Sequence, residues 1–329
     1  MKAFVTGGTG FIGGHLIKRL LRDGINVKAL ARDQIKADNL RKLGVEPVVG
    51  DITERNSIKS TLQGCDILYH LGNISSWWIP DKTQYYKVNV EGTRNIMLEA
   101  LEQGVKKVIY TSSLATIRKR NGESVTEKDI EHARDFQSHY GRSKFLAEQE
   151  ALRIHRESGL PVVILNPGVV IGPGDLKTFG RTLIELLNGE LKAIAFEESV
   201  APLVYIDDTV EAHILAAEKG RPGERYIIVG DNIKIGEIFK LVSKMARVPL
   251  PSKRISPFTA KLIAHVLEIK SSITGKPPKF AVDGVREMTA GAAGSNRKAK
   301  EELGIRFTPL EEALRKTINW YKENGYARF

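Results

Sequence analysis

Short apolar runs alternate with amphipathic segments along the first half of the chain. The apolar runs, each of which predicts a strand, are KAFVT, NVKALA, EPVVG, DILYHL, KKVIYTS and PVVILN. The segments between them predict helices over about Phe11–Arg22, from about Gln34, from about Glu54, over about Thr83–Glu102 and over about Gln137–Glu157. Hairpins cannot join parallel strands, so this order requires crossovers. The pattern predicts an α/β protein with a doubly wound parallel sheet, which binds ligands beyond the carboxyl ends of its strands.

A glycine-rich turn follows the first predicted strand. The sequence TGGTGFIGG places Gly7, Gly10 and Gly13 in G-x-x-G-x-x-G spacing at the start of the first predicted helix. A turn this tight needs backbone conformations that a Cβ forbids, and bare backbone lets a pyrophosphate approach the amino end of the helix. A turn without a ligand is the alternative, but the position between strand and helix favours dinucleotide binding.

The end of the second predicted strand bears on the choice between NAD and NADP. An acidic residue about 20 positions after the glycines would bind the ribose hydroxyls, and a basic one would neutralise a 2′-phosphate. The sequence KALARD has Ala31 at that place and Arg32 next to it, which favours NADP. Alternatively, Arg32 is solvated and Asp33 binds the ribose of NAD. After the third strand, Asp51 either accepts from the adenine amino group or caps the helix expected near Glu54.

The sequence YGRSK places Tyr140 four residues before Lys144, on one face of a predicted helix. This spacing alone fits an ordinary exposed pair. The order of motifs, however, resembles the extended short-chain dehydrogenase/reductase family, which has a Rossmann fold. The matching motifs are TGGTGFIGG, GDI, YHLGN, VNVEGT, YTSS, YGRSK and NPGVVIGPGD, and they span essentially the whole chain. Within this family the chain looks most like the branch of dihydroflavonol reductases and 3β-hydroxysteroid dehydrogenases.

The resemblance implies catalytic roles for four residues. Tyr140 would donate the proton to a carbonyl oxygen, and the Lys144 ammonium would lower the tyrosine pKa by favouring the phenolate. The Ser113 hydroxyl would bind the substrate oxygen, with Ser112 as the weaker match. Asn89 matches an asparagine that supports a proton relay around the lysine, or it stabilises a helix bend.

The resemblance also implies a set of cofactor-binding positions. These are Gly7, Gly10, Phe11, Ile12, Gly13, Arg32, Asp51, Ile52, Leu71, Gly72, Asn73, Tyr140, Lys144, Pro167, Val169 and Val170. The family more usually has Arg before the proline, where this chain has Asn166, and this difference weakens any inference about the hydrogen bonds there. The resemblance further implies a homodimer that pairs the helices after the fourth and fifth strands.

Beyond about Pro167 the pattern becomes irregular, with a helix expected from about Arg181. We therefore expect residues 1–166 to form the dinucleotide-binding domain and residues 167–329 mainly the smaller, C-terminal substrate-binding lobe, with segments that return to the first domain. Asp207 and Asp208 could form a carboxylate pair. The spacing of Asp208 and Glu211 instead favours a helix cap before an apolar run.

Composition and charge narrow the function classes. The formal net charge of the 329 residues is +11, but Lys and Arg are interleaved with Glu and Asp, so we expect no nucleic-acid partner. The single cysteine, Cys65, excludes an internal disulfide and fits a reducing cytoplasm. The histidines show no metal-ligand spacing, and the longest apolar run is too short to cross a bilayer. We predict no metal and no transmembrane segment.

The leading hypothesis is an NADP-dependent oxidoreductase, with NAD possible, that acts on a keto or hydroxy group of a small, largely apolar substrate. The alternative is a nucleotide-sugar epimerase with tightly bound NAD. A non-catalytic dinucleotide sensor or nucleic-acid-binding relative is disfavoured because Tyr140 and Lys144 are both present. Trp77 and Trp78 either line the substrate site or plug the space between lobes. The apolar helix expected from Pro257 either packs on the lobe, closes over a lipophilic substrate or touches a membrane surface.

Overall fold

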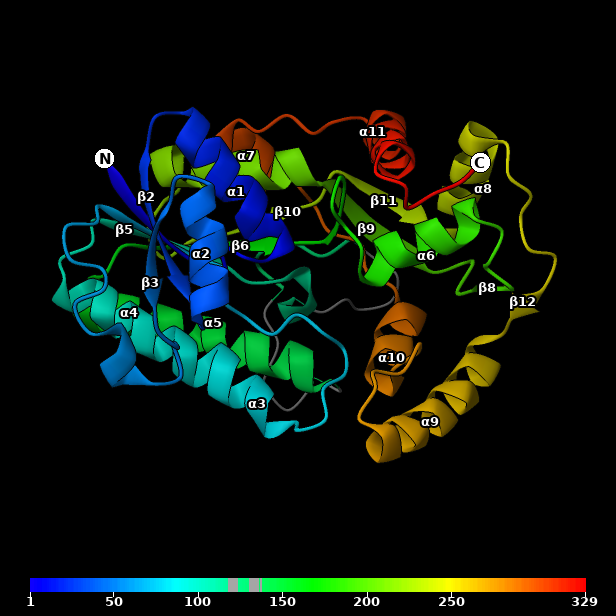
Figure 1. Cartoon of the computed structure of the whole chain (residues 1–329), viewed down its shortest axis with the longest axis horizontal. Helices are drawn as coiled ribbons and strands as arrows, with labels where there is room; N and C mark the ends of the chain where they lie inside the picture. The colour runs from blue at the N-terminus through cyan, green and yellow to red at the C-terminus, as the bar shows by residue number, and fades with distance from the viewer. Residues whose placement is uncertain (118–123, 130–135, 137) are drawn as a thin grey trace.

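The structure is a computed structural model that describes residues 1–117, 124–129, 136 and 138–329. Its centre is a seven-stranded parallel sheet in the order β10-β6-β5-β4-β1-β2-β3 (Figure 1). The strands are β1 (Lys2–Thr6), β2 (Asn26–Ala31), β3 (Glu46–Val49), β4 (Ile67–His70), β5 (Lys107–Thr111), β6 (Val162–Pro167) and β10 (Arg225–Ile228). The predicted α/β fold with a doubly wound parallel sheet is confirmed.

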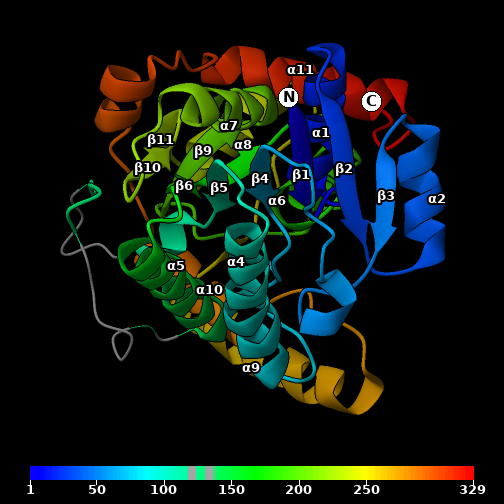
Figure 2. The same cartoon turned by 90° about the vertical axis from the view of Figure 1, so that its left-hand side faces the viewer.

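Helices cover both faces of this sheet (Figures 1 and 2). They are α1 (Phe11–Arg22), α2 (Gln34–Lys42), α3 (Thr83–Tyr86), α4 (Gly92–Glu102), α5 (His139–Ser158) and α7 (Ile206–Lys219). Side chains alternate along each strand, so Ala3 and Val5 pack in the core that holds α1 and α7, whereas Phe4 packs in the core that holds α4 and α5. Each face is thus closed by its own layer of helices.

The remaining elements form a smaller group beside the carboxyl ends of the main strands (Figure 1). One small sheet has the order β11-β9-β7 and another pairs β12 with β8. The strands are β7 (Val169–Ile171), β8 (Ile194–Ala195), β9 (Val200–Tyr205), β11 (Asp231–Lys234) and β12 (Arg254–Ile255). The helices are α6 (Thr178–Leu187), α8 (Ile235–Ala246), α9 (Pro257–Thr274), α10 (Val282–Ala290) and α11 (Leu310–Glu323). The domain boundary after residue 166 stays a prediction.

Several elements differ from the sequence-based expectations. In place of the helix expected from Glu54 there is only a 3-10 turn, Arg55–Ile58, and its capping position is Glu54 rather than Asp51. The long helix expected over Thr83–Glu102 contains a π-helical turn, Lys87–Glu91, between α3 and α4. Residue 137, where the next helix was expected to begin, lies outside the described residues; α5 begins at His139.

Asp208 is not a helix cap. It lies in the first turn of α7, where Tyr205 has the capping position. Its carboxylate instead accepts hydrogen bonds from the backbone N–H of Thr308, at 2.8 Å, and from the Thr308 hydroxyl, at 2.7 Å. Burial raises the Asp208 pKa, and these two hydrogen bonds oppose the shift. Asp208 therefore joins α7 to the segment before α11.

Candidate active site

The glycine turn at the end of β1 is built so tightly that side chains are excluded. Gly7 has φ +71°, and a Cβ there would lie 2.6 Å from the carbonyl carbon of Leu71. A Cβ on Gly13 would lie 2.2 Å from the carbonyl oxygen of Gly7, while the Gly10 N–H donates to that oxygen at 2.9 Å. Phe11 and Ile12 follow in the first turn of α1. The turn thus presents bare backbone at the amino end of a helix, which is the arrangement that binds a pyrophosphate.

A buried chain of hydrogen bonds holds the ends of β1 and β4 beside this turn. The Thr6 hydroxyl oxygen accepts from the N–H groups of Leu71, at 3.2 Å, and Gly72, at 3.0 Å. It also pairs with Nδ1 of His70 at 2.7 Å, and Nε2 of His70 pairs with the Thr93 hydroxyl at 2.9 Å. Burial lowers the His70 pKa to about 3, so the ring is neutral at physiological pH. These hydrogen bonds hold the ends of β1 and β4 in a fixed position beside the glycine turn.

Tyr140 is buried in the first turn of α5. The Ser138 side chain caps this helix by accepting from the Gly141 N–H at 3.1 Å. Ser113, which follows β5, lies near the Tyr140 side chain. Burial raises the tyrosine pKa, the interaction with Ser113 lowers it, and the Glu287 carboxylate raises it. The structure therefore brings together the two side chains expected to bind the substrate oxygen.

Lys144 lies one helical turn after Tyr140 and is also buried. Its ammonium donates to the carbonyl oxygen of Thr111 at 2.8 Å and to the Tyr110 hydroxyl at 3.2 Å, and it lies 4.8 Å from the centre of the Tyr110 ring. Burial lowers the Lys144 pKa to about 7, and the Glu148 carboxylate opposes this shift.

A lowering of the Tyr140 pKa by Lys144 stays a prediction. The net shift of the tyrosine pKa is upward, because the loss of solvent outweighs the interaction with Ser113. The lysine ammonium is itself directed to the end of β5, where it makes its hydrogen bonds. Burial is the dominant influence on both groups.

Glu148, a further turn along α5, is completely buried and was not singled out by the sequence. Its Oε1 accepts from the Asn166 side-chain amide at 2.5 Å and from the Thr116 hydroxyl at 3.2 Å. The Arg225 guanidinium, on the neighbouring strand β10, lies 3.7 Å from its Oε2. Asn166, where the family more usually has Arg, thus binds a carboxylate that also faces the Arg225 guanidinium. The spacing from Tyr140 through Lys144 to Glu148, four residues each time, was the signal that could have identified this acid.

Asn89 lies within the π-helical turn and is completely buried. Its side-chain oxygen accepts from the Ile74 N–H at 2.7 Å, and its amide donates to the Ile74 carbonyl at 3.2 Å and to the Ser143 hydroxyl at 2.9 Å. These contacts bind the loop after β4 to α5 at the bend between α3 and α4. A role in a proton relay stays a prediction.

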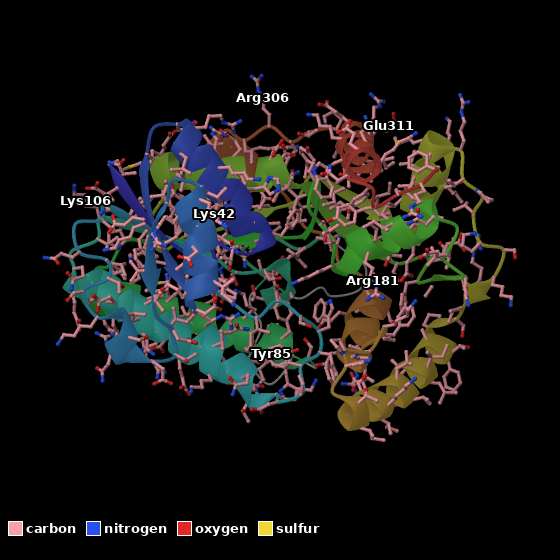
Figure 3. All side chains as sticks on the ribbon, in the orientation of Figure 1. Lys42, Tyr85, Lys106, Arg181, Arg306 and Glu311 are labelled. Carbon is pink, nitrogen blue, oxygen red and sulfur yellow. The ribbon has the colours of Figure 1, made fainter. Side chains whose placement is uncertain are left out.

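Aromatic and acidic side chains surround the start of α5. The edge of the Trp77 ring contacts the Tyr140 ring, with 4.9 Å between the ring centres. Trp77 also packs on α10, because a Cβ built on Gly284 would lie 3.4 Å from the indole. Trp78 is buried instead. Tyr85 on α3 lies on the same side of the molecule as α10 (Figure 3), and its ring stacks on His139 at the start of α5.

Two carboxylates of α10 contact the residues that begin α5. Asp283 accepts from the backbone N–H of His139 at 3.2 Å, and Glu287 accepts from the Ser138 hydroxyl at 2.8 Å. Trp77 and α10 thus pack around Tyr140 and the residues that begin α5. The sequence predicted neither of these contacts.

Three residues were expected near the adenosine part of the dinucleotide, and each has different contacts in the structure. Arg32 is exposed directly after β2. The Asp33 carboxylate caps α2 by accepting from the Lys36 N–H at 2.9 Å, and it forms an ion pair with the Lys36 ammonium at 2.6 Å. Both interactions lower the Asp33 pKa. Asp51 accepts from the backbone N–H and the hydroxyl of Thr53, each at 2.9 Å.

The crevice fits a nicotinamide dinucleotide. The glycine turn is a cradle that side chains would fill, and the Asn73 side-chain oxygen, just beyond β4, is buried without a hydrogen-bond partner among the described residues. Other predicted positions border the same edge of the sheet: Ile52 after β3, Pro167 at the end of β6, and Val169 and Val170 at the start of β7. In the described part of the chain, no group of three or more His, Cys, Asp or Glu residues could hold a metal ion. No helix there is long and apolar enough to span a membrane.

Comparison with known proteins agrees with this geometry. A model of the NAD dependent epimerase/dehydratase family matches residues 3–229. The chain belongs to this family, and it is therefore an NAD(P)-dependent oxidoreductase of the extended short-chain dehydrogenase/reductase type.

Individual relatives cover almost the whole chain. It is 32% identical to the "Putative dihydroflavonol 4-reductase" of Synechocystis sp., over 99% of this chain and 96% of that protein. It is 31% identical to "Sterol demethylase protein B" of Methylococcus capsulatus, over 99% of each. The crystal structure of gox2253 superposes with a TM-score of 0.85 at 34% identity, over 99% of each chain.

Proposed function

We propose that this protein is an NADP-dependent reductase of a keto group on a small, largely apolar molecule, and that Tyr140, Ser113 and Lys144 are its catalytic residues. The observation that carries the proposal is that Ser113, just beyond β5, lies close enough to the buried Tyr140 side chain to lower the tyrosine pKa. Two hydroxyl groups there can share one substrate oxygen. The Trp77 ring packs against the tyrosine ring and could form one wall of the substrate site.

The nicotinamide, when bound, supplies the hydride to the carbonyl carbon. The Ser113 hydroxyl donates a hydrogen bond to the carbonyl oxygen as negative charge develops on it. Tyr140 transfers its phenolic proton to that oxygen, so the product is a neutral alcohol and a phenolate remains. The Lys144 ammonium, one turn away, stabilises the phenolate until a proton returns from solvent. Because the Lys144 pKa is about 7, this ammonium titrates within the physiological range.

The first test replaces Tyr140 by Phe, which removes the proton and keeps the ring. We expect turnover to fall by roughly 10²-fold or more, since a positioned acid contributes about that factor, while NADPH still binds. Tyr326→Phe, at a partly exposed tyrosine, is the matched control. Steady-state kinetics and a fluorescence titration with NADPH give the two readouts. Unchanged turnover in Tyr140→Phe would remove Tyr140 from the mechanism.

The preference for NADP is supported by the use of Asp33 as a helix cap. Its carboxylate is already engaged by Lys36, whereas Arg32 is exposed next to the expected ribose position. We expect Arg32→Ala to raise the KM for NADPH much more than the KM for NADH. Arg41→Ala, at an exposed arginine on the helix α2 that follows Arg32, serves as the control. An equal rise for both cofactors would contradict the assignment to NADP.

The apolar substrate class is supported by the indole of Trp77 against Tyr140, and by relatives named for dihydroflavonol and sterol chemistry. The family also includes epimerases, which retain NAD throughout the reaction. Purified protein that carries tightly bound NAD and does not oxidise NADPH with any ketone would favour the epimerase. We further propose a cytoplasmic homodimer that pairs α4 and α5, on the basis of the family resemblance and the single cysteine.

A further inference from the structure

Helix α9 is apolar on two opposite sides. Its inner side packs against α10, with Ala260, Ala264 and Ser271 buried. Its outer side carries large apolar side chains that are 60 to 82% exposed: Phe258, Leu262, Val266, Ile269 and Ile273. A helix that is apolar on both sides is normally buried on both sides. One side of α9 therefore has no partner among the described residues of this chain.

The exposed side chains form one continuous stripe. Residues of an α-helix are about 100° apart around the axis, so positions 258, 262, 266, 269 and 273 fall within roughly 80° of one another. The stripe extends over most of the helix, which lies at the outer edge of the molecule (Figures 1 and 2). Single exposed apolar residues need no explanation, but a contiguous patch of this kind marks an interaction surface.

The segment that carries the stripe is mostly basic, and two of its basic residues, Arg254 and Lys279, are paired with Glu197 and Glu185. Residues 253–279 include six basic side chains, namely Lys253, Arg254, Lys261, Lys270, Lys276 and Lys279. The only acidic residue in this range, Glu268, accepts a hydrogen bond from the Val282 N–H at 2.8 Å. By the same helix geometry, Lys261 and Lys270 border the stripe on opposite sides. Neither lysine forms an ion pair with any residue that the structure describes.

We propose that α9 docks on the surface of an anionic lipid bilayer, lying in the plane of the interface. The apolar stripe would enter the boundary between headgroups and acyl chains, and the flanking lysines would bind lipid phosphates while their methylene stems cover apolar surface. A second copy of this chain fits less well, because a two-fold contact through the stripe would place the lysines of both copies around one seam. The proposal does not depend on the catalytic assignment.

Docking through α9 would place the crevice close to the lipid surface. Helix α10 lies between α9 and the start of α5, since it packs on α9 and binds His139 and Ser138 through its carboxylates. The same helix backs the Trp77 ring. The lipid-facing surface and the substrate side of Tyr140 are thus two sides of one α9–α10 unit.

The experiment measures co-sedimentation of the full chain with vesicles. We compare vesicles of phosphatidylglycerol and phosphatidylcholine with vesicles of phosphatidylcholine alone. The wild-type protein should bind the anionic vesicles more tightly, and added salt should weaken this binding. In the double variant Leu262→Ser/Ile269→Ser, binding should fall at least tenfold. The control Leu43→Ser/Val49→Ser, which changes two exposed apolar residues elsewhere, should bind like the wild type.

A second pair of variants tests the charge. Lys261→Ala/Lys270→Ala should weaken binding to anionic vesicles by roughly fivefold per lysine, with little effect on neutral vesicles. The control Lys18→Ala/Lys42→Ala changes two exposed lysines on α1 and α2; Figure 3 shows Lys42 far from α9. Far-UV circular dichroism checks that each variant is folded.

Three results would overturn the proposal. The first is wild-type protein that does not bind anionic vesicles, and the second is a folded Leu262→Ser/Ile269→Ser variant that binds them as tightly as the wild type. The third is a combined result. The wild type binds no vesicles and is a dimer in analytical ultracentrifugation, whereas the Leu262→Ser/Ile269→Ser variant is a monomer. That result would assign the stripe to a second copy of the chain.

Discussion

Replacing Arg225 by Met should leave the Glu148 carboxylate buried in α5 without its guanidinium partner, and we expect this change to destabilise the protein strongly. Glu148 is completely buried, Arg225 is 7% exposed, and 3.7 Å separate Nη2 of Arg225 from Oε2 of Glu148. Two unit charges about 4 Å apart attract by roughly 4 kcal/mol at an effective dielectric constant near 20. Removing one partner of a buried pair costs about 3–5 kcal/mol. The free energy of unfolding should fall by an amount in this range.

The matching change, Glu148→Gln, keeps an acceptor for Asn166 and Thr116 but removes the charge. The double variant Glu148→Gln/Arg225→Met removes both charges of this pair, so its loss of stability should be at least about 2 kcal/mol smaller than the sum of the two single losses. Urea unfolding followed by circular dichroism measures all four proteins. Losses that add to within about 0.5 kcal/mol would refute the coupling.

An exposed ion pair provides the control for this double-mutant cycle. Lys234 and Glu198 lie 2.8 Å apart, with side chains 50% and 81% exposed. Water and salt screen such a pair, so Lys234→Met should change stability little and show no coupling to Glu198→Gln. The contrast between the two cycles isolates the effect of burial.

Three further predictions concern the crevice. Gly7→Ala should abolish NADPH binding in a fluorescence titration, because φ at this position is +71° and the new Cβ would lie 2.6 Å from the Leu71 carbonyl carbon. Normal binding of NADPH by this variant would contradict the assignment of the glycine turn to the cofactor site. Trp77→Ala should raise the KM for apolar ketones more than it lowers kcat, since it removes the wall beside Tyr140; an unchanged KM would place the substrate elsewhere. Unfolding at a series of pH values should show the burial of Lys144. Its pKa is about 7 in the folded protein and near 10.5 when unfolded, so the unfolded chain binds more protons between these values and stability should rise with pH there. Lys144→Met should abolish that rise, and a rise that persists would assign it to another group.

Much of the main sheet could be predicted because each strand carries its own local pattern. All six predicted strands are present in the parallel sheet, and the helices α1 and α2 begin at Phe11 and Gln34 as expected. The seventh strand, β10, could not be predicted in the same way. Its sequence RYII is a short apolar run like those of the other strands, but it lies in the half of the chain whose pattern is irregular, and only the folded chain shows that it pairs with β6.

The same distinction between local and long-range sequence signals applies to the candidate site. The glycine turn and the pair formed by Tyr140 and Lys144 depend on residues close together in the sequence, and their spacing was informative. The contacts of Asp283 and Glu287 with the start of α5 join residues more than a hundred positions apart, and no local pattern predicts them. The direction of the Tyr140 pKa shift also needed the fold, because burial rather than a neighbouring charge determines it.

The contacts between α10 and α5 let residues distant in the sequence influence the Tyr140 phenol. Glu287 holds the Ser138 hydroxyl and, as a nearby negative charge, disfavours the phenolate of Tyr140. A movement of α10 away from α5 would therefore weaken one electrostatic obstacle to ionisation and expose the first turn of α5 to water. The pKa of Tyr140 thus depends partly on the position of α10, although we assign no catalytic residue to that helix.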